Sequence, residues 1–462
     1  MFLLDDNSPL PFYKQLYNQI RVRILSGDLA ADFKLPSVRE LAAQLSTSRN
    51  TVDGAYQELY AEGFIYSRER SGYFVSALDQ EAGAPPAEQL TSRSREPKAP
   101  PRLRWDFHPA RLDPQSFPVS LWRKCYTTAL NECAGTLGEY ADRQGEWALR
   151  NEIRQYLERS RGVTCEEEQI VVTAGLQHSL ELVAHLVRDR HDAVALENPG
   201  YHLPGAVFEN NGFRLSHIDV HPSGIDIDRL KASGSSIVYV TPSHQLPMGC
   251  VMPVANRLRL LEWAGNDKLI LEDDYDSELR YHGKPISSLQ GLRPGGNVVY
   301  LGTFSKVLSP TLRLAYLVLP QVLLSSYRAR YRDYFSTAPL LEQRAMALFM
   351  REGHWERHLR RMRIVYEKKH DALLGAVARH FGDGAAVLGA GAGLHVVLRL
   401  LRQNPGEAEI LRRAEAKGIR LHPFSQMCRG AEPSGTHLLL GFGGMEPGVV
   451  EEGIAIISTL CT

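Results

Sequence analysis

The spacing of apolar residues near the N-terminus predicts three helices. In residues 11–26 the apolar side chains recur every four positions and a glycine follows, which is typical of a helix that ends there. Ser37, with a glutamate three residues later, has the pattern of a capping box and predicts a second helix from Ser37 to about Leu45. Residues 46–51 form a turn and a new helix start, and the third helix is expected to end near Gly63.

A short hairpin is expected to follow these helices. The apolar runs 64–66 and 73–75 are typical of strands, and the polar residues 67–72 between them suit a turn. Three helices and a hairpin predict a winged helix-turn-helix over residues 1–78. In such folds the third helix enters the DNA major groove with its first residues, and the hairpin can reach the backbone or the minor groove. A helical protein-interaction module with solvated arginines is the alternative.

The remaining chain has the pattern of a linker and then of a large α/β domain. Residues 79–104 are rich in proline and mixed charge and nearly lack large apolar side chains, which predicts a flexible linker. In residues 105–462, strand-like runs alternate with helical patterns, which indicates a mostly parallel sheet covered on both faces. The expected strands are residues 170–173, 193–196, 237–240, 269–271 and 298–301.

Composition narrows the class of protein without naming its function. A chain of 462 residues with 44% hydrophobic residues has room for a large core, and it contains no apolar run long enough for a membrane helix. The six cysteines are scattered without metal-ligand or disulfide spacing, so no metal site is expected. The first residues lack the basic region of a secretory signal, and a reducing cytoplasm fits best.

Net charge does not predict DNA binding, whereas the placement of charge does. The whole chain has a formal net charge of zero, and residues 1–78 carry 8 positive against 9 negative side chains. Arginines nevertheless fall at the start of the second helix, the start of the third helix and the hairpin tip, beside short side chains that suit phosphate contacts. The candidate DNA-binding residues are Arg39, Ser48, Arg49, Asn50, Thr51, Arg68, Arg70 and Gly72.

A lysine at the end of the last predicted strand is the first candidate for chemistry. Ligands of open α/β sheets collect at the carboxyl ends of strands, where Lys306 is expected. An apolar environment lowers the pKa of a lysine, which frees its amine to form a Schiff base. The hydroxyls of Thr303 and Ser305 and the fork of Arg313 suit a phosphate. Together they indicate a pyridoxal-phosphate pocket, against the plainer interpretation of a surface lysine that follows a core strand.

Three other strand ends carry polar residues of matching kinds. Residues 173–178 precede a helical pattern, so their amides can face a phosphate. Tyr201 follows a strand at a turn, where its ring can stack on a flat heterocycle. Asp273 and Tyr275 end another apolar run, and a carboxylate that faces a pyridine nitrogen keeps that nitrogen protonated. Each has a plain structural explanation alone, but their joint order before Lys306 favours one cofactor site.

Five motifs carry a resemblance to a known family. Residues 1–78 resemble a GntR-type winged helix, and residues 105–462 resemble the fold-type-I aminotransferases, which have a smaller C-terminal α+β subdomain. The fusion resembles the MocR subfamily of bacterial transcriptional regulators over essentially the whole chain. The motifs are Leu-Pro-Ser-Val-Arg-Glu-Leu-Ala (35–42), Ser-Arg-Asn-Thr-Val (48–52), Thr-Pro-Ser-His-Gln (241–245), Glu-Asp-Asp-Tyr-Asp-Ser-Glu-Leu-Arg-Tyr (272–281) and Gly-Thr-Phe-Ser-Lys (302–306).

The resemblance implies a role for each residue of the site. Lys306 would bind pyridoxal 5'-phosphate (PLP) covalently, Asp273 would pair with the pyridine nitrogen, and Tyr275 would contact the phenolic oxygen. Tyr201 would stack on the ring, and a tyrosine similar to Tyr140 reaches the partner subunit's phosphate. The residues that would hold the phosphate are Thr303, Ser305, Arg313, Gly175, Leu176 and Gln177.

The resemblance also implies partners. The family implies a homodimer, often head-to-tail, that binds a double-stranded DNA operator. Its effector would be an amine, an amino acid or a B6 vitamer, including PLP itself.

Two departures from an aminotransferase bear on function. The loop that usually carries Asn-Pro has Leu246-Pro247 here, and residues 436–442 have leucine where many aminotransferases place an arginine that clamps the substrate carboxylate. Losing a bidentate clamp removes positioning that transamination needs, although Arg429 is a possible substitute. We therefore expect a regulator that senses an effector. The alternatives are an active aminotransferase with an appended DNA-binding domain and a DNA-binding protein whose pocket is only structural.

Overall fold

The chain divides into two compact units. The computed structural model describes residues 2–6, 8–78, 103–281, 286–402, 405–430 and 434–461. One unit spans Met1–Ala99 and the other Pro100–Thr462. The predicted linker, residues 79–104, lies outside the described residues except for its last two positions.

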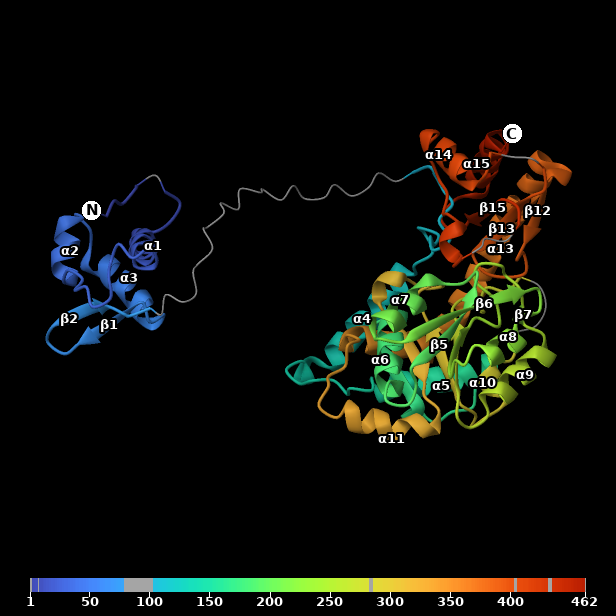
Figure 1. The fold of residues 1–462 in the computed structure, drawn as a ribbon, viewed down its shortest axis with the longest axis horizontal. Coiled ribbons are helices and arrows are strands. Elements are labelled where there is room, and N and C mark those ends of the chain that lie inside the picture. Colours follow the sequence, from blue (N-terminus) through green and yellow to red (C-terminus); the bar gives the residue numbers. More distant parts are fainter. Residues whose placement is uncertain are drawn as a thin grey trace. The chain divides into compact units, whose positions relative to one another are not determined.

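The N-terminal unit is three helices followed by a hairpin (Figure 1). The capping box predicted at Ser37 is present: its hydroxyl accepts from Glu40 N, and Glu40 accepts from Ser37 N at 3.0 Å. Leucine, isoleucine, valine and tyrosine side chains from the helices and the hairpin form one buried core. The elements are α1 (Phe12–Leu25), α2 (Val38–Gln44), α3 (Arg49–Ala61), β1 (Ile65–Arg68) and β2 (Gly72–Val75).

The large unit is built on an eight-stranded sheet of mostly parallel strands. Its parallel strands β5, β6, β8, β9 and β10 confirm the expected mostly parallel sheet. The strands β6, β7 and β11 were not expected from the sequence, and β11 lies antiparallel between β10 and β4. In spatial order the strands are β4 (Ile170–Thr173), β11 (Ala315–Val318), β10 (Val298–Thr303), β9 (Leu269–Asp274), β8 (Ile237–Val240), β5 (Ala193–Asn198), β6 (Arg214–His221) and β7 (Gly224–Ile225).

Helices cover both faces of this sheet because consecutive residues of the central strands are apolar and point to opposite faces. Val299 and Leu301 of β10 share one buried cluster with residues of α6, α7 and α11. Val298 lies in a cluster on the other face with residues of α8, α9 and α10. These helices are α6 (Leu176–Val187), α7 (His202–Asn210), α8 (Ile227–Ala232), α9 (Val254–Ala264), α10 (Leu289–Leu292) and α11 (Gln321–Arg330).

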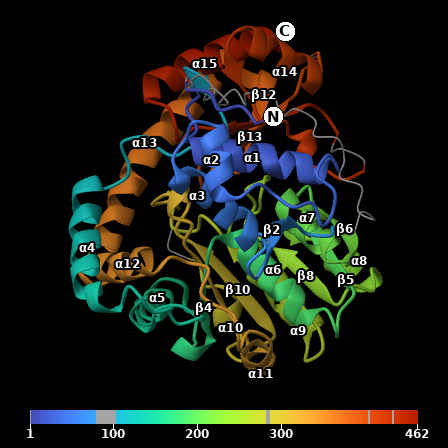
Figure 2. The same cartoon turned by 90° about the vertical axis from the view of Figure 1, so that its left-hand side faces the viewer.

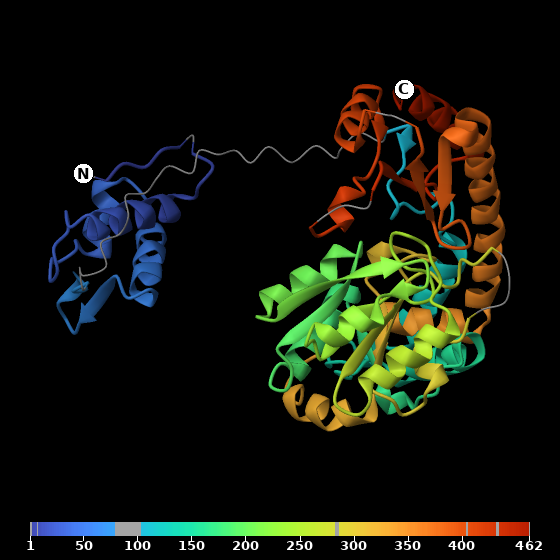
Figure 3. The ribbon, with the colours of Figure 1, turned by 45° about the vertical axis from the view of Figure 1, so that its right-hand side comes forward.

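A helical layer joins the large sheet to a smaller C-terminal subdomain. Figure 2 shows α4, α12 and α13 side by side, and Figure 3 shows α13, in orange, extending to the small sheet. The small sheet has the antiparallel order β12-β13-β15, and β14 pairs with β3. The helices of this part are α4 (Val119–Glu132), α5 (Trp147–Arg161), α12 (Leu340–Arg351), α13 (His354–Phe381), α14 (Glu407–Ala416) and α15 (Pro447–Leu460). Its strands are β3 (Trp105–Asp106), β12 (Ala385–Leu388), β13 (His395–Leu400), β14 (Ile419–Arg420) and β15 (His437–Gly441).

Among the helices of the described ranges, none combines the length and the apolar character that crossing a membrane requires.

Candidate functional site

The predicted cofactor residues gather around one cavity of the large unit. The cavity has a volume of about 390 Å³, within the range usual for small-molecule sites. Lys306 reaches it from the loop that follows β10, at the carboxyl edge of the sheet. Nine of the eleven predicted cofactor residues line it: Leu176, Gln177, Tyr201, Asp273, Tyr275, Thr303, Ser305, Lys306 and Arg313.

The surroundings of Lys306 favour its neutral amine. Desolvation lowers the pKa of Lys306, while the carboxylates of Asp276 and Asp273 act in the opposite direction. The Lys306 Nζ atom lies 5.8 Å from the centre of the Tyr275 ring. A lysine with a lowered pKa in a cavity is suited to react with an aldehyde.

The pleat of β9 turns three consecutive acids, Glu272, Asp273 and Asp274, to alternate faces of the sheet. Glu272 accepts hydrogen bonds from the backbone N–H groups of Leu289 and Gln290 at 2.7 and 3.1 Å, at the start of α10. Asp274 forms a buried ion pair with Arg161, in which Nε and Oδ2 lie 2.6 Å apart. Asp273 lies between them and points to the opposite face, where it lines the cavity.

Asp273 is a buried acid that forms no ion pair with the other described residues. Burial raises its pKa to about 7, although the Tyr239 hydroxyl donates a hydrogen bond to it and counteracts this. The Tyr275 hydroxyl lies 3.1 Å from His244 Nδ1, which in turn lies 2.9 Å from Asp276 Oδ2. The Asp273 carboxyl therefore faces the cavity, where a protonated ring nitrogen would stabilise its charged form. The Tyr275 phenol also lines the cavity, and His244 holds its hydroxyl.

Arg313 and the start of α6 form a cradle for an anion. The Arg313 Nη2 atom donates to Ala174 O at 3.0 Å, directly before the first turn of α6. Gly175 does not line the cavity, but its φ of +96° and its closeness to Arg313 make glycine necessary: a Cβ there would lie 2.2 Å from Arg313 Nη2. The Thr303 and Ser305 hydroxyls lie 2.9 Å apart beside this cradle. Amides, hydroxyls and a guanidinium of this kind suit a phosphate.

Tyr140 lies outside the cavity. Its side chain is 80% exposed, and its ring stacks on that of Phe335 with centroids 4.1 Å apart. Its role in binding the partner subunit's phosphate stays a prediction.

Several residues that line the cavity had no local signal in the sequence. His395 is contributed by the small sheet, while His108 and His422 follow the short strands β3 and β14. His202 begins α7, beside Tyr201. Tyr239, which supports Asp273, lies inside an apolar strand where a core tyrosine would be assumed. Only the folded arrangement brings these residues together.

Of the two departures from an aminotransferase, only the one at Leu246 reaches the cavity. Leu246 lines the cavity at the position where an asparagine is usual, and none of the three leucines of β15 lines it. Among the described lining residues, Arg313 is the sole arginine. Arg429 lines a separate, smaller cavity of about 80 Å³ that shares Tyr201 with the first. The described part of the chain thus supplies no second guanidinium to this cavity for a substrate carboxylate.

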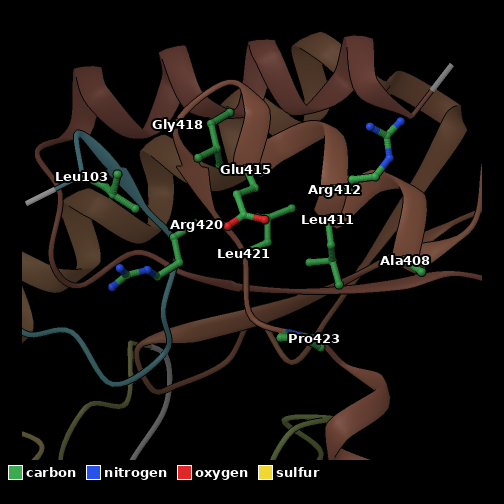
Figure 4. Close-up of a pocket in the computed structure, with 10 residues that line it drawn as sticks. Leu103, Ala408, Leu411, Arg412, Glu415, Gly418, Arg420, Leu421 and Pro423 are labelled. Atoms are coloured by element: carbon green, nitrogen blue, oxygen red, sulfur yellow. The ribbon is translucent and has the colours of Figure 1, made fainter. Parts of the chain in front are cut away.

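A larger surface hollow lies on the C-terminal subdomain (Figure 4). Its volume is about 620 Å³, and it shares no lining residue with the cavity of Lys306. Its cations are already paired, because Arg412 binds Glu409 and Arg420 binds Asp106. It offers apolar contact and no reactive group, so we do not assign it chemistry.

The predicted DNA-binding residues lie on the surface of the N-terminal unit. Ser48 caps α3, and its Oγ accepts from Thr51 N at 3.1 Å. Arg49 and Asn50 are exposed in the first turn, and Arg39 is exposed on α2. In the hairpin, Arg70 and Gly72 have φ values of +58° and +104°, while Arg68 is held by Asp32 at 2.8 Å. The first turn of α3 therefore presents free amides and a cation, whereas Arg68 has to leave its partner to reach DNA.

Comparison with known proteins gives the same two-part organisation. Residues 12–75 match the bacterial regulatory proteins of the gntR family, and residues 122–422 match aminotransferase class I and II. The chain is 37% identical to the HTH-type transcriptional regulator YdeL of Bacillus subtilis over 98% of this chain and 97% of that protein. It is 34% identical to the probable rhizopine catabolism regulatory protein MocR of Rhizobium meliloti, over 98% and 94% of the two chains. It is 30% identical to the HTH-type pyridoxine biosynthesis transcriptional regulator PdxR of Corynebacterium glutamicum, over 98% and 97%.

Solved structures resemble the large unit. An archaeal alanine:glyoxylate aminotransferase superposes with a TM-score of 0.71 at 25% identity, covering 78% of this chain and 91% of that one. The α-aminoadipate aminotransferase LysN of Thermus thermophilus superposes with a TM-score of 0.68 at 26% identity, covering 77% and 91%.

The residues present fit the cofactor of those enzymes. Lys306 offers an amine for its aldehyde, Asp273 a buried carboxylate for its ring nitrogen, and the cradle at Arg313 a place for its phosphate. PLP, when bound, supplies a reactive aldehyde and an electron-accepting ring. The chain belongs to the MocR-type regulators of the GntR family, transcriptional regulators in which a DNA-binding winged helix is fused to an aminotransferase-like domain that binds PLP.

Proposed function

We propose that the aminotransferase-like domain acts as a sensor for a small amine, an amino acid or a B6 vitamer. Lys306 would hold the cofactor until the amine of the effector replaces the lysine amine on it. This exchange would alter the DNA affinity of the winged helices. The observation that carries the proposal is the content of the cavity. It holds a reactive lysine and the partners of a cofactor, but its lining includes one arginine, which the phosphate needs.

The roles of the lining residues follow from their chemistry. Lys306 attaches the cofactor, Asp273 pairs with its ring nitrogen, and Tyr275 contacts its phenolic oxygen. Tyr201, half-buried at the start of α7, stacks on its ring. The phosphate is held by Thr303, Ser305, Arg313 and the turn at Gly175, Leu176 and Gln177.

We infer that the regulator works as a homodimer in which the subunits lie head-to-tail. Tyr140 and Phe335 form an exposed aromatic pair, with side chains 80% and 59% exposed. Leu137, Trp147 and Tyr334 are also exposed large apolar residues of the same unit. Exposed apolar side chains of this size favour a protein–protein contact, and Tyr140 is the residue proposed to reach the partner's phosphate.

Operator recognition is assigned to the first turn of α3 and to the hairpin. Arg49 and Asn50 are placed to read base edges, while Ser48, Thr51 and Arg39 contact phosphates. Arg68, Arg70 and Gly72 lie at the hairpin tip, which can follow the backbone or the minor groove.

An active aminotransferase is the second candidate, favoured by the fold and by the nine predicted cofactor residues that line the cavity. Turnover requires that an amino donor be held for repeated proton transfer. The apolar Leu246 and the lack of a second arginine in the described lining weigh against it. Multiple turnovers with an amino donor and a keto acceptor would support this candidate over the sensor.

Two measurements test the sensor. We expect PLP to give an absorbance band of bound cofactor with the wild-type protein and none with Lys306→Ala, while Lys306→Arg serves as a charge-preserving control that also lacks the band. We then expect the affinity for DNA upstream of the gene, measured by gel-shift with PLP, to change when an effective amine is added. An amine-independent affinity that is the same with and without PLP would contradict the proposal.

A further inference from the structure

The lining of the cofactor cavity includes three histidines on three separate segments. His108 follows β3, His202 begins α7 and His422 follows β14, and all three line the cavity that contains Lys306. The rings of His108 and His422 contact each other edge-on, with centroids 5.1 Å apart. Two imidazoles of the C-terminal subdomain therefore contact each other, and His202 of α7 lines the same cavity.

These imidazoles have hydrogen-bonding groups to spare. His108 Nδ1 accepts from Ala110 N at 3.1 Å, which leaves Nε2 to carry the proton of the neutral ring. Among the described residues, Nε2 of His108 has no hydrogen-bond partner, and neither ring nitrogen of His422 or His202 has one. His395, which also lines the cavity, differs because its Nε2 is engaged by Pro247 O at 3.1 Å.

We propose that His108, His202 and His422 bind an anionic group of the effector, in place of the arginine that clamps a carboxylate in many aminotransferases. This inference rests on the proposed sensor function and names its ligand class: a primary amine that also carries a carboxylate or a similar oxyanion. Unpaired imidazole N–H groups donate to such an anion, and an imidazole that gains a proton adds a charge to the contact.

The charges around His108 leave it neutral before the effector binds. Desolvation and then His422 lower the pKa of His108, Asp106 raises it, and Arg111 and Lys306 lower it further. Asp106 also binds Arg111 at 3.0 Å and Arg420 at 3.3 Å, so its charge is shared. An anion placed beside His108 would raise its pKa, so binding would take up protons.

His422 has a comparable environment. Desolvation and then His202 lower its pKa. On the neighbouring strand β15, His437 stacks on Phe424 and does not line the cavity. The carboxylates of Asp273 and Asp276 lie in the same cavity and act against a second anion, which makes the three imidazoles the favourable side for one.

The test uses the full-length protein loaded with PLP and pairs of probes that differ in one group. Glycine, β-alanine and 4-aminobutanoate are each compared with the alkylamine in which a methyl group replaces the carboxylate. Affinities come from titrating the bound-cofactor absorbance band. The ratio within a pair cancels the pH dependence of the amine itself. For at least one pair we expect the acid to bind about tenfold more tightly or better, with the ratio rising from about pH 8 to about pH 6.

Histidine variants identify the groups responsible. In the triple variant that carries His108→Gln, His202→Gln and His422→Gln, we expect the preference for the acid and its pH dependence to disappear. Calorimetry in two buffers of different ionisation enthalpy should show proton uptake with the wild-type protein and none with the triple variant. His191→Gln is the matched control, because His191 is also half-buried with a pKa lowered by desolvation but does not line the cavity.

The outcomes separate this inference from the sensor proposal. Equal binding of acids and matched amines, or a preference that survives in the triple variant, overturns the histidine site and leaves the sensor intact. If none of the amines or acids shifts the band, the histidine site is overturned and a B6 vitamer becomes the effector to test for the sensor.

Discussion

The guanidinium of Arg313 lies against Gly175 so closely that a Cβ at Gly175 would come within 2.2 Å of Arg313 Nη2. The two residues are 138 positions apart in sequence, yet together they shape the start of α6 into an anion cradle. Gly175→Ala should displace Arg313 and weaken PLP binding about tenfold or more, measured by absorbance or fluorescence titration. Gly234→Ala is the control, because Gly234 also has a positive φ of +71° but open space around it. It should cost about 1 kcal/mol of stability and leave PLP affinity unchanged.

Asp273 should make the cofactor-free protein less stable as the pH rises. Burial raises its pKa from 3.8 to about 7, so between these values the folded state binds more protons than the unfolded state. The stability that the protonated Asp273 gives to the folded state is therefore lost as the pH rises from about 4 to about 7. Asp273→Asn should flatten this decline by at least about 1 kcal/mol in denaturant unfolding.

The same substitution should reduce PLP affinity, since the ring nitrogen loses its carboxylate partner. Glu278→Gln gives a matched control: Glu278 is also buried with a pKa raised to about 7, but it does not line the cavity. It should flatten the pH dependence and retain PLP binding. Equal loss of PLP in both variants would remove Asp273 from its proposed role.

Arg161→Ala should destabilise the large unit by about 3–5 kcal/mol, because it leaves the buried Asp274 carboxylate without its partner. Urea unfolding of the cofactor-free protein measures the change. Arg412→Ala removes an exposed arginine that pairs with Glu409, and it should cost less than about 1 kcal/mol. Similar costs for the two would show that Asp274 is satisfied by other groups.

Arg49→Ala should weaken operator binding by about 1–3 kcal/mol if Arg49 reads a base edge at the start of α3. Affinity and its salt dependence are measured by fluorescence anisotropy. Arg21→Ala removes the same charge from α1, where the guanidinium lies 5.7 Å from the Phe64 ring, and should change operator binding far less. Equal effects would indicate general charge attraction and not a base contact.

Local sequence signals predicted much of the fold. Ser37 and Ser48 cap helices as expected because capping depends on residues within one turn. The strand ends near Asp273 and Lys306 were predictable because apolar runs followed by polar residues are local patterns as well. The strand β11 was not predicted, because its place in the sheet depends on pairing with β4 and β10, which are distant in sequence or lie across a loop.

The histidines that line the cavity could not be predicted from local sequence signals. His108 and His422 follow two-residue strands that pair across more than 300 positions of sequence, Ile419 with Trp105. No local spacing marks such residues as neighbours. The assigned roles of the cofactor and DNA contacts stay predictions that the variants above can test.

The pleat of β9 has a consequence for how this domain tolerates sequence change. Because Glu272, Asp273 and Asp274 alternate between two faces, a shift of one position would send Asp273 towards the interior and turn a neighbouring acid into the cavity. A substitution at one of these acids would remove the contacts of that acid alone. A single deletion early in β9 would instead turn all three acids to the opposite face of the sheet. Length in this strand is therefore under tighter constraint than the identity of any one of its acids.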